Sequence, residues 1–214
     1  MKKTISILMM LLSFSLASAE DKKVDSKKVE PKKEAGKMTV EIATFAMGCF
    51  WCVQPVFDKA DGVIQTYVGF SGGNEKKPTY KQVSSGKTKH AEAIEITFDP
   101  TKITYEKLLE LYWNNIDPTD GTGQFVDRGS QYRPAIFYHN EEQKKLAEES
   151  KKRIEASKKY SKAIAVEIVP YKFFARVEGG DADIHEKYYE KNPFGYELYK
   201  KGSGREKILK EIHK

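Results

Sequence analysis

The sequence has few of the residues that build disulfide scaffolds and metal clusters. Its 214 residues contain only two cysteines, Cys49 and Cys52. Two are too few for a disulfide-dense scaffold or for a four-thiolate zinc or iron–sulfur site. The chain also has only four histidines, no two of which have the spacing of metal ligands. We therefore expect no bound metal and no other bound cofactor.

The chain has little net charge outside its N-terminal tail. Lys and Arg number 37 against 31 Asp and Glu, a net charge of +6. Residues 1–37 hold nine Lys and five acidic residues, which is +4, and residues 38–214 hold the other +2 (28 minus 26). Lys and Glu are mixed over residues 141–160, and no aromatic platform accompanies them. We therefore expect no nucleic-acid partner.

Long apolar runs are absent except at the N-terminus. Lys2 and Lys3 precede an apolar stretch at residues 5–16, and residues 17–19 (Ala-Ser-Ala) supply the small side chains of a cleavage site. This layout is typical of a secretory signal peptide, and the run is short for a membrane span. We predict a signal peptide over 1–19 and an exported protein, periplasmic or secreted, that meets the membrane only by targeting. An uncleaved signal anchor is the alternative.

The rest of the chain divides into a tail and one domain. Residues 20–37 are mostly Lys, Glu and Asp, which predicts a disordered linker. From residue 38 to 214, strands and helices alternate, so we expect an α/β (α+β) two-layer domain. Residues 117–133 are predicted to be a long loop, and the tail after 169 to be mostly irregular. Strands are predicted over 39–45, 63–70, 91–98, 135–138 and 163–169, and helices from the cysteines to residue 60, over 104–113 with Thr104 as N-cap, and over 141–160.

Cys49 and Cys52 lie where a predicted strand gives way to a predicted helix. Pro55 fits only the first turn, so this helix should start close to the cysteines. The unpaired N–H groups and the helix dipole favour a thiolate there, and we expect a lowered thiol pKa. A spacing of three allows a disulfide, or lets one sulfur resolve an oxidised form of the other. A structural disulfide is the plain alternative in an exported protein.

Glu92 has the spacing of a buried residue. It alternates with the apolar residues of the strand predicted over 91–98, on the face that a sheet would bury. A carboxyl group among apolar neighbours stays protonated and can donate a proton. The alternative is a carboxylate at the exposed start of the strand. Tyr80 and Tyr132 lie in loop contexts where a hydroxyl can reach a ligand, although packing is the commoner role among twelve tyrosines.

A set of motifs extends over residues 40–200 and resembles the class A peptide methionine sulfoxide reductases in order and spacing. The motifs are GCFW (48–51), YVGFSGG (67–73), PTY (78–80), SG (85–86), HAEA (90–93), DP (99–100), DRGSQYR (127–133) and KNPFGY (191–196). The resemblance implies a two-layer sandwich with a ferredoxin-like core and a long coiled C-terminal segment.

The resemblance also implies a reaction. Methionine S-sulfoxide, in proteins, in peptides or free, is reduced to methionine as repair of oxidative damage. The implied nucleophile is Cys49, which is left as a sulfenic acid, and the implied proton donor is Glu92. Two tyrosines would donate hydrogen bonds to the sulfoxide oxygen, two aromatic residues would hold the methyl group, and an aspartate would orient the polar part of the site. These substrate-binding residues are Tyr80, Tyr132, Phe50, Trp51 and Asp127.

The chain departs from the family pattern at Cys52. Many members have Gly there and carry recycling cysteines near the C-terminus, where this chain has none. Cys52 is thus the only intramolecular candidate, which implies a Cys49–Cys52 disulfide reduced by a thioredoxin-like or other external dithiol. Direct reduction by an external thiol is the alternative. Residues 179–183 before His185 also differ from the family's usual stretch, and we assign His185 no role. We expect a monomer.

Two other functions compete with this prediction. A thioredoxin-like protein dithiol–disulfide oxidoreductase would also use a CxxC motif, but it normally encloses Gly-Pro or similar residues and has no use for Phe50, Trp51 or Glu92. A non-enzymatic exported binding module would combine a structural disulfide with the basic tail.

Overall fold

The computed structural model describes residues 39–213. The signal peptide predicted over 1–19 and the linker predicted over 20–37 lie outside these residues. Within the described part, no helix combines the length and the apolar character that a membrane crossing requires.

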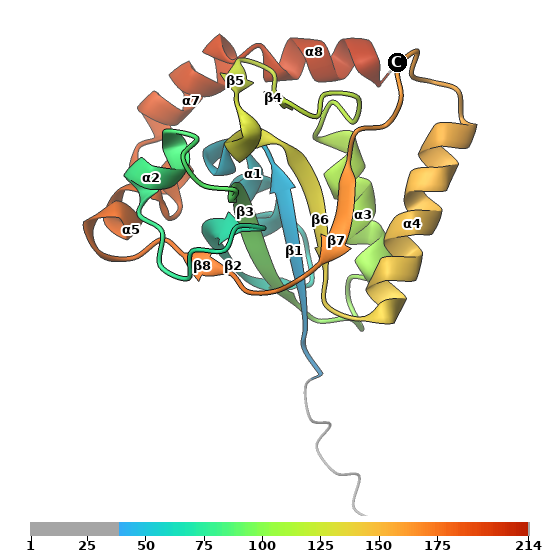
Figure 1. The fold of residues 1–214 in the computed structure, drawn as a ribbon, viewed down its shortest axis with the longest axis horizontal. Helices are drawn as coiled ribbons and strands as arrows, with labels where there is room; N and C mark the ends of the chain where they lie inside the picture. The colour runs from blue at the N-terminus through green and yellow to red at the C-terminus, as the bar shows by residue number, and fades with distance from the viewer. Residues whose placement is uncertain (1–38, 214) are drawn as a thin grey trace, which may run out of the picture. The chain divides into compact units, whose positions relative to one another are not determined.

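A six-stranded sheet in the order β7-β6-β1-β3-β2-β8 forms the centre of the domain (Figure 1). Its neighbouring strands are antiparallel except β6 and β7, which are parallel. The strands are β1 (Glu41–Met47), β2 (Val63–Ser71), β3 (Ala91–Phe98), β6 (Pro134–Tyr138), β7 (Glu167–Pro170) and β8 (Ala175–Arg176).

Three helices cover one face of the sheet: α1 (Phe50–Asp58), α3 (Tyr105–Asn114) and α4 (Glu141–Ala156). The expected α/β class is confirmed, since helices and strands alternate around one central sheet. The ferredoxin-like core stays a prediction, which the strand order β6-β1-β3-β2 and the positions of α1 and α3 between strands support.

The main core lies between the sheet and these helices. Alternate residues of β1 and β3 point to it, among them Phe45, Ile94 and Ile96, all fully buried. The opposite residues of the same strands are small, as at Ala46 and Ala93, and this lets the segment after β7 pack across the second face. The period-two pattern therefore buries both faces of the sheet.

The helix starts follow the capping residues. Thr104 caps α3, as expected, and its hydroxyl accepts a hydrogen bond from the Lys107 amide at 3.3 Å. Asn140 caps α4 in the same way. The first turn of α1 begins beside the cysteines as predicted, but Pro55 lies in the second turn rather than the first. Burial of α1 against β2 and β3 outweighs the hydrogen bond that this proline removes.

The tail after residue 169 differs most from its prediction. It was expected to be mostly irregular, yet it forms β8 and four helices. Each helix is short, and Asn192 with Pro193 supplies the local start signal of the longest one. Short helices are marginal alone, so packing against the sheet domain stabilises them. They are α5 (Gly179–His185), α6 (Tyr188–Lys191), α7 (Pro193–Gly202) and α8 (Arg205–Ile212).

Smaller differences concern element ends and the loops. The helix predicted over 141–160 ends at residue 156, and the strand predicted over 163–169 begins only at 167. The loop predicted over 117–133 contains a two-stranded ribbon and a short 3₁₀ turn. Hydrogen bonds between Asp or Thr side chains and nearby amides form such local structure without a hydrophobic pattern. The additional elements are α2 (Tyr80–Ser84), β4 (Gly123–Gln124), β5 (Asp127–Arg128) and η1 (Ser130–Tyr132).

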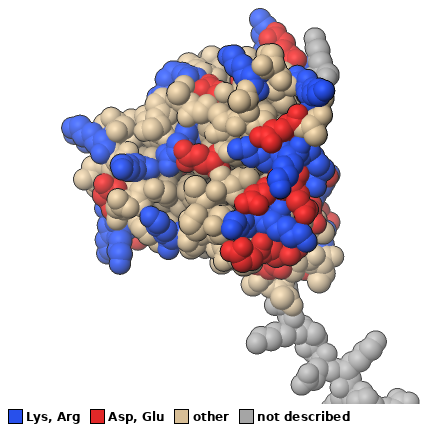
Figure 2. Space-filling view, turned by 45° about the vertical axis from the view of Figure 1, so that its right-hand side comes forward, with Lys and Arg blue, Asp and Glu red and all other residues tan. Residues whose placement is uncertain are grey.

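The charged surface of α4 is mixed. Figure 2 brings this side of the molecule forward and shows Lys and Arg interspersed with Asp and Glu rather than in separate patches. Lys144 pairs with Glu141 one turn earlier on the helix. This mixture of charges is typical of an ordinary solvated helix face.

Candidate active site

Cys49 is the N-cap of α1, directly after the end of β1. Gly48 makes the turn between them with a φ of +84°, and a Cβ there would lie 2.7 Å from the Cβ of Gln124. Only glycine fits both this backbone conformation and this close approach. The turn places the Cys49 thiol at the N-terminus of α1, buried with 7% of the residue exposed.

Glu92 lies beside the same helix end. It is 2% exposed, and its Oε2 accepts a hydrogen bond from the Phe50 amide, the first of α1, at 3.1 Å. Burial raises the pKa of Glu92 from 4.5 to about 8, although the Phe50 amide opposes the shift. At neutral pH the carboxyl group is therefore mostly protonated. A proton donor thus lies next to the thiol, in the position that the alternation of β3 predicts.

The buried carboxyl group makes stability depend on pH. The folded state binds this proton more tightly than the unfolded chain, so its contribution to folding falls as pH rises from 4.5 to about 8. Glu92→Gln removes the dependence, and we expect the variant to gain on the order of 4 kcal/mol over wild type across this range. Urea unfolding of both proteins between pH 5 and pH 9 measures the difference. If the free energy of unfolding changed with pH equally in both proteins, a neutral, buried Glu92 would be contradicted.

The Cys49 thiol differs from its prediction. A lowered pKa was expected at the helix N-terminus, but the pKa of Cys49 is raised well above its ordinary value. Burial is the largest cause, followed by the nearness of Glu92 and Cys52, and these outweigh the helix end. The resting site therefore holds a neutral thiol next to a neutral carboxyl group.

Tyr199 links Cys49 to Asp127. The hydroxyl of Tyr199, on α7, donates to Asp127 Oδ1 at 2.6 Å, and the same hydroxyl lies close enough to Cys49 to act against the rise in its pKa. Burial raises the pKa of Asp127, while Tyr199 and Arg205 oppose this. Asp127 thus orients the Tyr199 hydroxyl near the thiol, and its role toward a substrate stays a prediction.

An aromatic wall surrounds the start of α1. Phe50 is buried against Phe70, and Trp51 stacks on Tyr188 with ring centroids 3.9 Å apart. The Trp51 indole Nε1 donates to His185 Nδ1 at 3.0 Å. His185, which has no predicted role, is therefore a fixed part of this wall, and burial lowers its pKa.

Tyr80 and Tyr132 come to the same site from different segments. Tyr80 begins α2, and its ring lies 4.0 Å from that of His185, while Tyr132 ends η1. Burial is the largest cause that raises the pKa of both phenols, followed by the nearness of Glu92, so both remain hydrogen-bond donors at neutral pH. The structure thus brings together all the predicted substrate-binding residues around Cys49 and Glu92.

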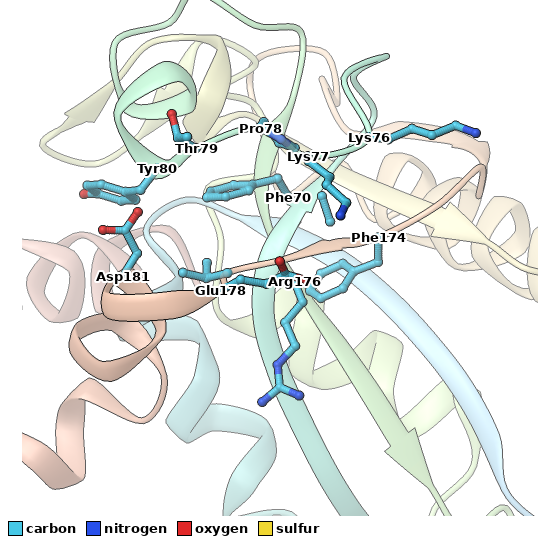
Figure 3. A pocket seen from close by; sticks show the side chains of 12 residues that line it. Phe70, Lys76, Lys77, Pro78, Thr79, Tyr80, Phe174, Arg176, Glu178 and Asp181 are labelled. Carbon is cyan, nitrogen blue, oxygen red and sulfur yellow. The ribbon is translucent and has the colours of Figure 1, made fainter.

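A pocket of about 300 Å³ adjoins Tyr80 (Figure 3). Tyr80 and Asp181 lie at one end of it, and the rings of Phe70 and Phe174 lie farther along. Lys77 extends a cationic side chain over the hollow. The pocket therefore lies on the α2 side of the site, next to Tyr80.

The chemistry that this arrangement supports is thiol chemistry with proton transfer. A buried thiol, a second thiol one helical turn away and a neutral acid lie together at the start of α1, near the hydroxyl groups of tyrosines. In residues 39–213 no three His, Cys, Asp or Glu side chains cluster as metal ligands would. These residues can donate a proton and hydrogen bonds to an oxygen atom while a sulfur atom attacks as nucleophile.

The sequence does not predict Tyr199 and Arg205 as site residues, because the tail after residue 169 is predicted to be mostly irregular. Tyr196 and Tyr199 are three apart, and a Lys pair follows them before Gly202. With Asn192-Pro193 ahead of them, this is a helix pattern with start and stop signals. That pattern could have identified α7, although not its contact with Cys49.

The family model described as peptide methionine sulfoxide reductase matches residues 41–214. Peptide methionine sulfoxide reductase MsrA of Bacillus licheniformis is 50% identical over 171 residues, which cover 80% of this chain and 92% of that protein. MsrA of Bacillus subtilis is 49% identical over 171 residues and is covered to 94%.

Solved structures of related proteins share the fold. Mxr1 from Saccharomyces cerevisiae in reduced form aligns with a TM-score of 0.67 at 32% identity, over 73% of this chain and 88% of that chain. Methionine sulfoxide reductase A of Corynebacterium diphtheriae aligns with a TM-score of 0.65 at 31% identity, over 75% of this chain and 79% of that chain.

Proposed function

Because the chain belongs to the peptide methionine sulfoxide reductase family, an oxidoreductase family that reduces methionine sulfoxide to methionine, we propose that Cys49, Glu92 and Cys52 carry this reaction in turn. The observation that supports it is the hydrogen bond between Glu92 and the first amide of α1, which holds a neutral carboxyl group beside the Cys49 thiol. A thioredoxin-like oxidoreductase has no need of this acid.

In the first step the Cys49 sulfur attacks the sulfoxide sulfur. Glu92 donates its proton to the sulfoxide oxygen, and Tyr80 and Tyr132 donate hydrogen bonds to the same atom as negative charge develops on it. The oxygen passes to Cys49, which becomes a sulfenic acid, while the methionine sulfur gains two electrons. The proton of the Cys49 thiol passes to the Glu92 carboxylate, so Glu92 ends the step neutral again. Phe50 and Trp51 form the apolar side of the site, against which the methyl group packs.

In the second step Cys52 displaces water from the Cys49 sulfenic acid. The Cys52 amide donates to the Cys49 carbonyl at 3.1 Å, so the two residues share the first turn of α1. Their sulfurs are one helical turn apart, which favours fast closure of a disulfide. An external dithiol, of the thioredoxin-like type expected from the sequence, then reduces this disulfide and restores both thiols.

Cys52→Ser separates the two steps. We expect reduced Cys52→Ser to form about one methionine per enzyme from an oxidised peptide, and then to stop or turn over far more slowly with a dithiol. Its Cys49 should be trapped as a sulfenic acid by a dimedone-type reagent. Methionine by chromatography, and intact mass, measure these two products.

The control is wild type under the same conditions, which should form methionine and a disulfide without a trapped adduct. Cys52→Ser that turns over with a dithiol at the wild-type rate would remove Cys52 from the cycle. A wild-type protein that forms no methionine would remove the proposed function itself.

A further inference from the structure

A pocket of about 370 Å³ lies between α1, α7 and α8 and reaches Cys52. It is separate from the hollow beside Tyr80, and its apolar wall comes from Pro55, Val56, Tyr196 and Leu209. Three cations and one acid complete its lining, a balance of +2 (3 minus 1). These residues are Lys59, Lys200, Arg205 and Glu206.

Arg205 is the unusual member of this lining. Only 4% of the residue is exposed, and its guanidinium donates to the Asn115 carbonyl at 2.7 Å and to the Met47 carbonyl at 3.0 Å. Among the ion pairs of residues 39–213, none neutralises Arg205. A buried cation is costly unless a negative charge is near. Arg205 acts on Asp127 without a direct ion pair, and it acts in the same sense on Cys52, where it favours negative charge on the sulfur.

The nearby sulfur is where that charge forms. Burial raises the pKa of Cys52, but Arg205 and Lys200 both act against this shift. Glu92 and Asp127 raise the pKa of both thiols, but Arg205 and Lys200 oppose the rise at Cys52. Of the two sulfurs, Cys52 is therefore the one that the electrostatics of this pocket favour as a thiolate.

We propose that this pocket admits the reducing thiol, that it selects a thiol carrying negative charge, and that the thiol attacks the Cys52 sulfur of the Cys49–Cys52 disulfide. The inference rests on the proposed function, since it concerns the disulfide which that cycle produces. The cations attract the anionic thiol, and Arg205 is a positioning residue for the charge on Cys52.

The exchange proceeds in two balanced steps. The incoming thiolate forms a bond to Cys52, the Cys49–Cys52 bond breaks, and its electron pair stays on Cys49, which takes a proton from neutral Glu92. A second thiol of the reductant then attacks the reductant's own sulfur in the mixed disulfide. The reductant leaves as its disulfide, and Cys52 is released as a thiolate beside Arg205.

The test uses the full chain oxidised with diamide to the Cys49–Cys52 disulfide. Its reduction is timed with 2-mercaptoethanesulfonate, an anion, and with neutral 2-mercaptoethanol, by quenching and intact mass. Lys59→Glu reverses an exposed charge of the pocket, and Lys145→Glu makes the same change on the exposed face of α4 as the matched control. Lys59 is chosen because Arg205→Gln would also remove two buried hydrogen bonds.

We expect Lys59→Glu to lower the ratio of the anionic to the neutral rate about three- to tenfold at low salt, and Lys145→Glu to leave it near the wild-type value. The difference should shrink at high salt. Peptide mapping of the early mixed disulfide should find the adduct on Cys52. An adduct on Cys49, or equal ratios in both variants, would overturn the inference.

Failure of this inference and failure of the proposed function give different results. The pocket is tested on a chain oxidised chemically, so its result does not depend on reduction of a sulfoxide. Suppose that reduced wild type forms methionine but the oxidised chain shows no preference for the anionic thiol. The proposed function would then stand, and the role proposed for the pocket would be rejected.

Discussion

Glu92→Gln is expected to slow the formation of methionine by about 10²–10⁴-fold, the usual range for loss of a general acid. The variant keeps the size of the side chain, and its amide oxygen can still accept the hydrogen bond from the Phe50 amide. It lacks a proton to give to the sulfoxide oxygen. A single turnover with excess enzyme, followed as methionine released, measures the chemical step alone.

Glu95→Gln is the matched control for this variant. Glu95 lies on the same strand with opposite side-chain direction, and it accepts a hydrogen bond from the Tyr171 hydroxyl at 3.2 Å. Its pKa is also raised by burial, so the two substitutions share a strand and a chemical change. We expect Glu95→Gln to keep most of the rate. A near-normal rate in Glu92→Gln would remove this residue from the mechanism.

Cys49→Ser is expected to abolish methionine formation, because a serine hydroxyl is not a nucleophile toward a sulfoxide under these conditions. The substitution exchanges one small side chain for another at the N-cap of α1, a position that serine favours. Thermal unfolding should therefore show little change in stability. Methionine released in a single turnover, compared with wild type and Cys52→Ser, is the measurement.

The contrast between the two cysteines is the decisive part of this comparison. Cys52→Ser should release about one equivalent of methionine, whereas Cys49→Ser should release none. Should Cys49→Ser form methionine and Cys52→Ser not, the roles of the two residues would be reversed. Equal activity in both variants would show that Cys49 is not the required nucleophile.

The sequence predicts the part of the site that lies on regular elements. The alternation along β3 places Glu92 on the buried face, and Gly48 with the apolar spacing after it places the cysteines at a helix start. Thr104 predicts the start of α3 because its hydroxyl bonds locally to the Lys107 amide. Each of these signals arises within a few residues of the position it predicts.

Long-range contacts decide what the sequence could not predict. Tyr199 meets Asp127 and Cys49 from a short helix far along the chain, and such helices form through packing rather than propensity. The direction of the Cys49 pKa shift likewise depends on burial and on Glu92, which outweigh the local helix end. A motif identifies the residues, whereas the balance of their charges depends on the assembled fold.

Pro55 in the second turn of α1 bears on the closure of the disulfide. Proline has no amide hydrogen, so the carbonyl four residues earlier, that of Trp51, receives no helical bond from it. Trp51 lies between the two cysteines, and the turn that holds both sulfurs is therefore tied to the rest of the helix by one bond fewer. The proposed Cys49–Cys52 disulfide would therefore form in a turn that Pro55 leaves with fewer helical bonds to the rest of α1.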